Sequence, residues 1–195
     1  MIIHDYKSIF IHVSKTGGSS IEHAFNPNIQ LDKKNAGAKK GNTSFKGKHF
    51  PARRYKLEYP DIFDSYFKFA FVRNPWDRLV SNWFWLRYLN LTPPKESFYE
   101  WLQTVVHRKN YTYKTMLTIN DEIAVDFVGK FESLGSDFQN VCEQIGATKI
   151  DLPHKNNLSD REHYSYFYNE ESKKLVEKHF AWEIDTFNYE FSEQK

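Results

Sequence analysis

Apolar residues recur along the chain with two periods, one typical of buried strands and one typical of amphipathic helices. Short runs rich in β-branched and aromatic residues predict strands, and each run is followed by a polar turn and then by a segment with helical spacing. Asn74 and Pro75 provide the cap and first position of one such helix. The predicted strands are 8–13, 66–72 and 124–131, and the predicted helices are 19–25, 75 onward, 136–145 and 170–187.

This alternation of strands and helices predicts an α/β fold with a mostly parallel sheet. In such sheets ligands bind at the carboxyl ends of the strands, so the turns after the first two strands are the candidate binding segments. The chain contains no internal repeat. We expect a single domain over 1–195, interrupted by a lysine-rich loop at 28–48, with an acceptor-specificity insertion at 91–120.

Composition and charge narrow the class of protein only slightly. The chain has 195 residues, of which 40% are hydrophobic and 27% charged, as in ordinary globular proteins. Aromatic residues make up 17%, which fits either a ring-filled core or an aromatic groove for sugars or nucleosides. The net charge is +2, but six lysines against one aspartate lie between Asn28 and His49, and such a loop either attracts anions or is simply solvated.

Targeting and redox features point to a reducing compartment. Cys142 is the single cysteine, which excludes an intrachain disulfide. The N-terminus lacks the pattern of a signal peptide, and no run approaches the roughly 20 apolar residues of a membrane span. A cytoplasmic protein without a membrane span is therefore expected.

The turn after the first strand has the composition of an anion-binding loop. Helix N-termini present unpaired N–H groups and a partial positive charge, glycines allow a sharp turn and close approach of a ligand, and lysine adds a full charge. The lysine precedes the glycines, unlike in a Walker A loop, so an ATP-dependent kinase is the second-ranked interpretation. The candidate residues are Lys15, Thr16, Gly17, Gly18, Ser19 and Ser20.

A second candidate phosphate site follows the strand at 66–72. Arg73 leaves this strand, and Ser81 follows eight residues later on the next helix. The guanidinium of Arg73 offers a planar fork of donors suited to phosphate, and the hydroxyl of Ser81 can donate a hydrogen bond. Asp77 is interpreted as favourable to the helix dipole and is not assigned to a ligand.

These two motifs resemble those of sulfotransferases, most closely the branch that includes carbohydrate sulfotransferases and their bacterial relatives. The resemblance implies that 10–20 is a 5′-phosphosulfate loop and that Arg73 and Ser81 bind the 3′-phosphate of 3′-phosphoadenosine 5′-phosphosulfate. It implies sulfonate transfer to a hydroxyl acceptor, with a carbohydrate expected, and release of adenosine 3′,5′-bisphosphate. The implied fold is a three-layer sandwich similar to that of P-loop NTPases. Segments 125–132 and 152–156 extend the resemblance.

The reaction needs a general base for the acceptor hydroxyl and a cation or donor for the leaving oxygen. Lys15 suits the second role. His49 is the leading base, because it lies between the two motifs in a segment similar to the one in which many sulfotransferases carry their catalytic histidine. Glu58 and Asp61 stay open as carboxylate bases, and His154 stays open as a second pocket histidine.

Neither a metal site nor a nucleic-acid partner is expected, and one further hypothesis stays open. No metal site is expected, since the chain has one cysteine and lacks the paired-histidine spacing of zinc sites. Nucleic acid is not an expected partner. A non-catalytic module that binds polyanions through the lysine-rich loop remains the alternative from a different class.

Overall fold

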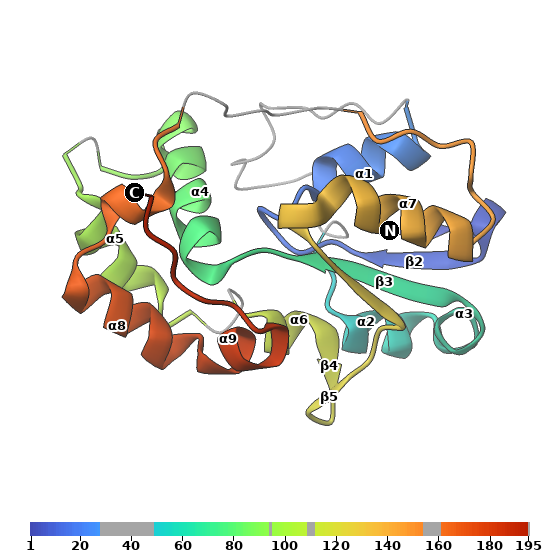
Figure 1. The fold of residues 1–195 in the computed structure, drawn as a ribbon. Coiled ribbons are helices and arrows are strands. Elements are labelled where there is room, and N and C mark those ends of the chain that lie inside the picture. The colour runs from blue at the N-terminus through green and yellow to red at the C-terminus, as the bar shows by residue number, and fades with distance from the viewer. Residues whose placement is uncertain (28–48, 94, 109–111, 154–160, 195) are drawn as a thin grey trace. The chain divides into compact units, whose positions relative to one another are not determined.

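The computed structural model describes residues 1–27, 49–93, 95–108, 112–153 and 161–194 (Figure 1). The chain divides into two compact units. The first comprises Met1–Val72 and Met116–Asn157, and the second comprises Arg73–Thr115 and Leu158–Lys195. The expected lysine-rich loop at 28–48 lies outside the described residues, and so does His154.

A four-stranded sheet organises the first unit. Its strands are β1 (Ile2–Ile3), β2 (Ser8–Ile11), β3 (Phe67–Val72) and β6 (Phe127–Lys130), arranged in the order β1-β2-β3-β6. β2 and β6 both pair in parallel with β3, whereas β1 pairs antiparallel with β2. The prediction of a mostly parallel sheet is therefore confirmed, and the carboxyl ends of β2 and β3 meet at one edge.

Helices flank this sheet on both faces (Figure 1). α1 (Gly18–Phe25) and α7 (Leu134–Gln144) cover one face, and α2 (Ala52–Glu58) and α3 (Pro60–Ser65) lie on the other. A small hairpin of β4 (Thr118–Ile119) and β5 (Glu122–Ile123) completes the unit, with 3₁₀ turns at His4–Tyr6 and Phe131–Ser133. This is the mixed α/β arrangement that the sequence predicts, and its likeness to P-loop proteins stays a prediction.

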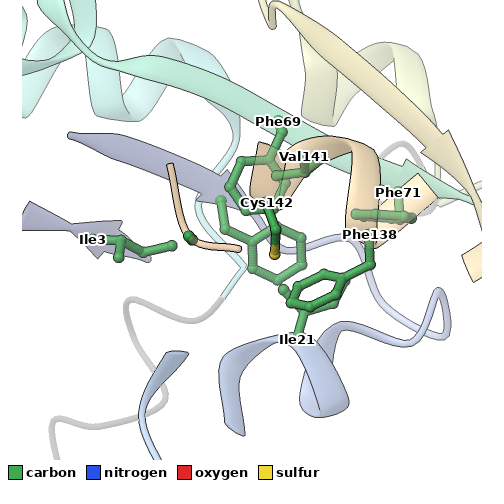
Figure 2. Close-up of a cluster of buried hydrophobic side chains, with 9 residues drawn as sticks. Ile3, Ile21, Phe69, Phe71, Phe138, Val141 and Cys142 are labelled. Atoms are coloured by element: carbon green, nitrogen blue, oxygen red, sulfur yellow. The ribbon is translucent and has the colours of Figure 1, made fainter. Parts of the chain in front are cut away.

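The core of the first unit lies between the sheet and α1 and α7 (Figure 2). Phe69 and Phe71 lie at alternate positions of β3, and their side chains point toward these helices. Ala70 and Val72 point to the other face of the sheet and are equally buried. Burial on both faces explains why the second part of β3, residues 69–72, is a continuous apolar run rather than an alternating one. On the helix side the cluster includes Ile21, Phe138, Val141 and Cys142.

The second unit is helical. Its helices are α4 (Pro75–Tyr88), α5 (Phe98–Val105), the start of α6 (Tyr113–Leu117), α8 (Glu170–His179) and α9 (Ala181–Phe187), with a 3₁₀ turn at Tyr164–Phe167. The side chain of Asn74 accepts hydrogen bonds from the N–H groups of Trp76 and Asp77, which confirms the predicted start of α4. Among the described helices none combines the length and apolarity needed to cross a bilayer.

The structure corrects several predicted boundaries. The segment predicted as helical over 170–187 is two helices, because Phe180 leaves the helical region at φ −119° and ψ 24°. Its ring is fully buried, so packing of the aromatic side chain accompanies the break. The predicted strand at 124–131 contracts to β6, and the one at 8–13 ends at Ile11.

Candidate active site

The loop between β2 and α1 has the backbone geometry that its glycine content predicts. Lys15 and Gly17 adopt left-handed conformations, with φ 66° and φ 81°. Gly17 is the N-cap of α1, and its carbonyl accepts from the N–H groups of Ser20 and Ile21. Within the described residues, no side chain caps this helix. The first turn of α1 therefore presents the partial positive charge that suits an anion.

The two glycines of the loop have different structural reasons, which sequence reasoning did not separate. Gly17 is required for its positive φ, and a Cβ there would also lie 2.6 Å from Cδ2 of Leu134. A Cβ on Gly18 would lie 2.3 Å from both Cδ2 and Nε2 of His12. Gly18 thus makes room for the imidazole of His12, and its expected role in close approach to a ligand stays a prediction.

The hydroxyl side chains of the loop also differ in their surroundings. Thr16 is fully buried, and its Oγ1 donates to the carbonyl of Val13 at 2.9 Å, so this hydroxyl braces the loop. Ser20 is buried, and Ser19 is half-buried at the start of α1. The assignment of these residues and Lys15 to a phosphosulfate group stays a prediction.

His49 lies beside this loop. Its Nδ1 is 2.9 Å from the carbonyl oxygen of His12, and the two imidazole rings meet edge to face with centroids 4.5 Å apart. His49 is exposed, whereas His12 is 3% exposed and is packed in the interior. The structure therefore brings the leading candidate base to the residue that begins the anion-binding loop.

The alternative carboxylate bases lie elsewhere in the first unit. Glu58 is at the end of α2, where its Oε1 accepts from Nε of Arg54 at 2.6 Å. Asp61 is exposed in the first turn of α3. Among the contacts of the described residues, none joins either carboxylate to the loop at 14–20. Their role as bases therefore stays a prediction.

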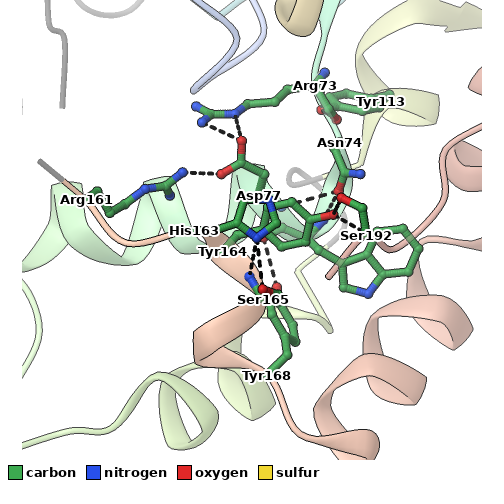
Figure 3. Close-up of polar contacts among 11 residues, drawn as sticks. Arg73, Asn74, Asp77, Tyr113, Arg161, His163, Tyr164, Ser165, Tyr168 and Ser192 are labelled. Atoms are coloured by element: carbon green, nitrogen blue, oxygen red, sulfur yellow. Dashed lines mark hydrogen bonds and ion pairs between the residues drawn. The ribbon is translucent and has the colours of Figure 1, made fainter. Parts of the chain in front are cut away.

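Arg73 is held in the second unit from its backbone and from its side chain (Figure 3). The hydroxyl of Tyr113 accepts from the Arg73 N–H at 2.9 Å and donates to the Arg73 carbonyl at 2.6 Å. Nε and Nη2 of Arg73 donate to Oδ2 of Asp77 at 2.9 and 2.7 Å. These contacts fix the direction in which the guanidinium leaves the backbone.

A second arginine joins this cluster. Nη2 of Arg161 donates to Oδ1 of Asp77, so one carboxylate holds two guanidinium groups. Two cations against one anion leave the cluster with a net positive charge. Ser81 is buried and lies four residues after Asp77 on α4, which places both on one face of that helix.

Sequence reasoning missed Arg161 and Tyr113 and interpreted Asp77 only as a helix-dipole residue. Arg161 is 84 residues from Asp77, and Tyr113 is 40 residues from Arg73, so no local pattern signals either contact. Tyr113 and α5 fall in the predicted acceptor insertion, yet Tyr113 is fully buried as a support for Arg73. The acceptor role of the rest of 91–120 stays a prediction.

Within the described ranges, no group of three or more His, Cys, Asp or Glu side chains is arranged to hold a metal ion. The structure thus defines two sets of candidate residues, each within its own unit. His49 and the loop at 14–20 form one set, and Arg73, Asp77 and Arg161 form the other.

Comparisons with known proteins agree with the sequence motifs. An uncharacterized protein of Archaeoglobus fulgidus is 30% identical over 89 residues, which cover 44% of this chain and 72% of that protein. No solved structure matches. A sequence model described as the sulfotransferase family matches residues 1–190, and this chain therefore belongs to the sulfotransferase family.

Proposed function

We propose that this sulfotransferase takes its sulfonate group from 3′-phosphoadenosine 5′-phosphosulfate and transfers it to a hydroxyl of a carbohydrate. The observation that carries the proposal is the contact of His49 with the His12 carbonyl, two residues before the loop at 14–20. The candidate base and the candidate anion site are thereby joined to one stretch of backbone between β2 and α1. The carbohydrate rests on the branch of the family that the motifs resemble.

The loop suits the 5′-phosphosulfate end of the donor. The left-handed turn at Gly17 directs the chain into α1, whose first N–H groups and dipole favour negative charge. Lys15 adds a full positive charge in the same turn. The hydroxyl of Thr16 is used inside the loop, so its expected contribution to the donor is through the backbone.

The arginine cluster of the second unit suits the 3′-phosphate. Arg73 and Arg161 supply donors in planar forks, which match the geometry of phosphate oxygens. Asp77 holds both guanidinium groups in place before a ligand arrives, which reduces the entropy lost on binding. Ser81, one turn further along the same face of α4, supplies the hydroxyl.

The chemistry assigns one role to each of two residues. Nε2 of His49 accepts the proton of the acceptor hydroxyl as the oxygen forms its bond to sulfur. The bond between sulfur and the bridging oxygen breaks, and its electron pair stays on the departing bisphosphate. Lys15 stabilises the charge that develops on this bridging oxygen. His49 ends the step as an imidazolium, so the proton is accounted for.

Thermal unfolding with adenosine 3′,5′-bisphosphate, ATP or adenosine 5′-monophosphate tests the donor assignment. A ligand that binds only the native state adds about 2.7 kcal/mol at 100 times its Kd. For a chain of this length that is a rise in Tm of roughly 5–11 °C. We expect the bisphosphate alone to give this rise, and we expect Arg73→Ala to abolish it.

Arg108→Ala is the matched control, because Arg108 is an exposed arginine of the same unit. It should keep the full rise in Tm. A rise with ATP alone would favour the kinase, and no rise with any nucleotide would favour the polyanion-binding module. Once an acceptor is found by screening sugars, His49→Ala should lower turnover by about 10²–10⁴-fold without weakening bisphosphate binding.

A further inference from the structure

A buried polar pair, His12 and Glu22, lies next to the candidate base His49. The imidazole of His12 is stacked on the ring of Phe10 with centroids 5.4 Å apart, and its Nδ1 is 2.7 Å from Oε1 of Glu22. Glu22 is the fifth residue of α1, and it is 5% exposed. His12 lies within the segment 10–20 but has no role assigned there, and Glu22 lies two residues beyond that segment.

Retaining a carboxyl group at this depth is costly. Buried polar groups destabilise a fold unless they are hydrogen-bonded, and a well-packed apolar pair is often as stable as a buried polar one. Burial, and then the nearby Glu22 carboxylate, raise the pKa of the Tyr55 hydroxyl, which indicates how weakly this region is solvated. Position 18 is also a glycine, and a Cβ there would overlap the His12 ring.

The geometry around His49 defines which of its ring nitrogens can act as a base. A backbone carbonyl can only accept a hydrogen bond, so Nδ1 of His49, at 2.9 Å from the His12 carbonyl, carries the hydrogen. In the neutral ring the lone pair is then on Nε2. Free histidine favours the opposite tautomer, with the hydrogen on Nε2.

We infer that Glu22 and His12 are positioning residues for His49. Glu22 holds the imidazole of His12, His12 directs its carbonyl at Nδ1 of His49, and the two imidazole rings pack edge to face. The pair thereby keeps His49 as the Nδ1–H tautomer, in which the lone pair lies on Nε2. The catalytic meaning of this arrangement rests on the proposed function, but the arrangement can be tested without a substrate.

The test is the tautomeric state of His49, read from long-range ¹H–¹⁵N correlation spectra of the full chain with ¹⁵N-labelled histidine. Spectra are recorded at about pH 8, where an unperturbed imidazole is neutral. His49→Ala identifies the signal of His49. We expect the wild-type signal to be that of the Nδ1–H form alone, and a wild-type signal of the Nε2–H form would overturn the inference.

Two variants separate positioning from packing. The double variant His12→Phe with Glu22→Leu replaces the polar pair by apolar groups and keeps a ring at position 12. We expect it to lose the single tautomer and give a mixture. A pure Nδ1–H signal in the folded double variant would show that the pair does not position His49.

Glu22→Gln is the conservative variant, since its amide oxygen can still accept from Nδ1 of His12. We expect His49 to stay in the Nδ1–H form, and a mixture here would overturn the inference even if the double variant does not fold. None of these spectra depends on nucleotide binding, because they are recorded on the protein alone. Failure of the proposed function, seen as no stabilisation by the bisphosphate, is therefore distinguishable from failure of this inference.

Discussion

Replacing Gly18 by alanine tests how the anion-binding loop is built. A Cβ at this position would lie 2.3 Å from two atoms of the His12 ring, whereas ordinary contacts begin near 3.4 Å. The ring would have to move by about 1 Å to relieve this overlap. Such a movement is resisted on two sides, by the stacking on Phe10 and by the 2.7 Å hydrogen bond to Glu22.

The expected change in the free energy of unfolding is the balance between helix propensity and steric overlap. Helix propensity alone favours alanine over glycine by about 1 kcal/mol within a helix. Overpacking costs about 1–3 kcal/mol, and displacing the ring from Glu22 would break a buried polar pair, which costs about 3–5 kcal/mol. We therefore expect Gly18→Ala to lower the free energy of unfolding by about 2 kcal/mol or more, the opposite sign to that of propensity.

Gly135→Ala is the matched control for this assay. Gly135 lies in the first turn of α7, and a Cβ there would meet nothing within 4 Å. Thermal unfolding followed by circular dichroism should show a Tm lowered by about 4–8 °C for Gly18→Ala, and a Tm unchanged or slightly raised for Gly135→Ala. Equal Tm values for the two variants would refute the argument that the His12 ring decides the residue at position 18.

A double-mutant cycle identifies the clashing partner. His12→Ala removes the ring that a Cβ at position 18 would meet. Added to His12→Ala, the Gly18→Ala substitution should therefore cost less than it does in the wild-type chain. Strict additivity of the two free-energy changes would point to a cause other than the ring.

Three further predictions follow from buried groups. Tyr113→Phe removes both hydrogen bonds to the Arg73 backbone, so we expect a loss of about 1–3 kcal/mol in thermal unfolding, whereas Tyr166→Phe, 64% exposed, should change little. Burial raises the pKa of the Glu183 carboxyl above its usual 4.5, more than Arg78 and the backbone N–H groups lower it. The stabilisation that comes from the protonated Glu183 carboxyl is complete below pH 4.5 and is lost as the pH rises through the pKa of the folded state. The urea midpoint of Glu183→Gln should therefore rise relative to that of the wild type over this pH interval. Burial raises the pKa of the Cys142 thiol to about 11, so alkylation at about pH 8 should be slow in the folded protein and fast in urea, and similar rates would contradict the buried placement.

Local sequence signals were sufficient for the order of the elements. The strand character of β2 and of β3, the start of α4 at Asn74 and Pro75, and the left-handed turn at Gly17 each depend on residues that are close together in the sequence. Hydrophobic period, capping residues and glycine conformational freedom act over that range. The sequence therefore predicted both candidate phosphate-binding segments, together with the resemblance that indicated their chemistry.

Other predictions depended on packing and were incomplete. The apolar period of 170–187 continues through Phe180, so it did not reveal that the burial of this ring accompanies a break between α8 and α9. Two adjacent glycines predict a tight turn but do not distinguish Gly17 from Gly18. Only the position of the His12 ring shows why position 18 also needs the space that glycine leaves.

By itself the sequence determined the alternation of strands and helices, the anion-binding composition of the loop at 14–20 and the choice of His49 as a candidate base. Tertiary structure alone decided which residues support these groups. His49 meets the His12 carbonyl across 37 residues, Tyr113 meets Arg73 across 40, and Arg161 meets Asp77 across 84. Such contacts leave no periodic trace in the chain, because they form only when packing of the apolar faces brings distant segments together.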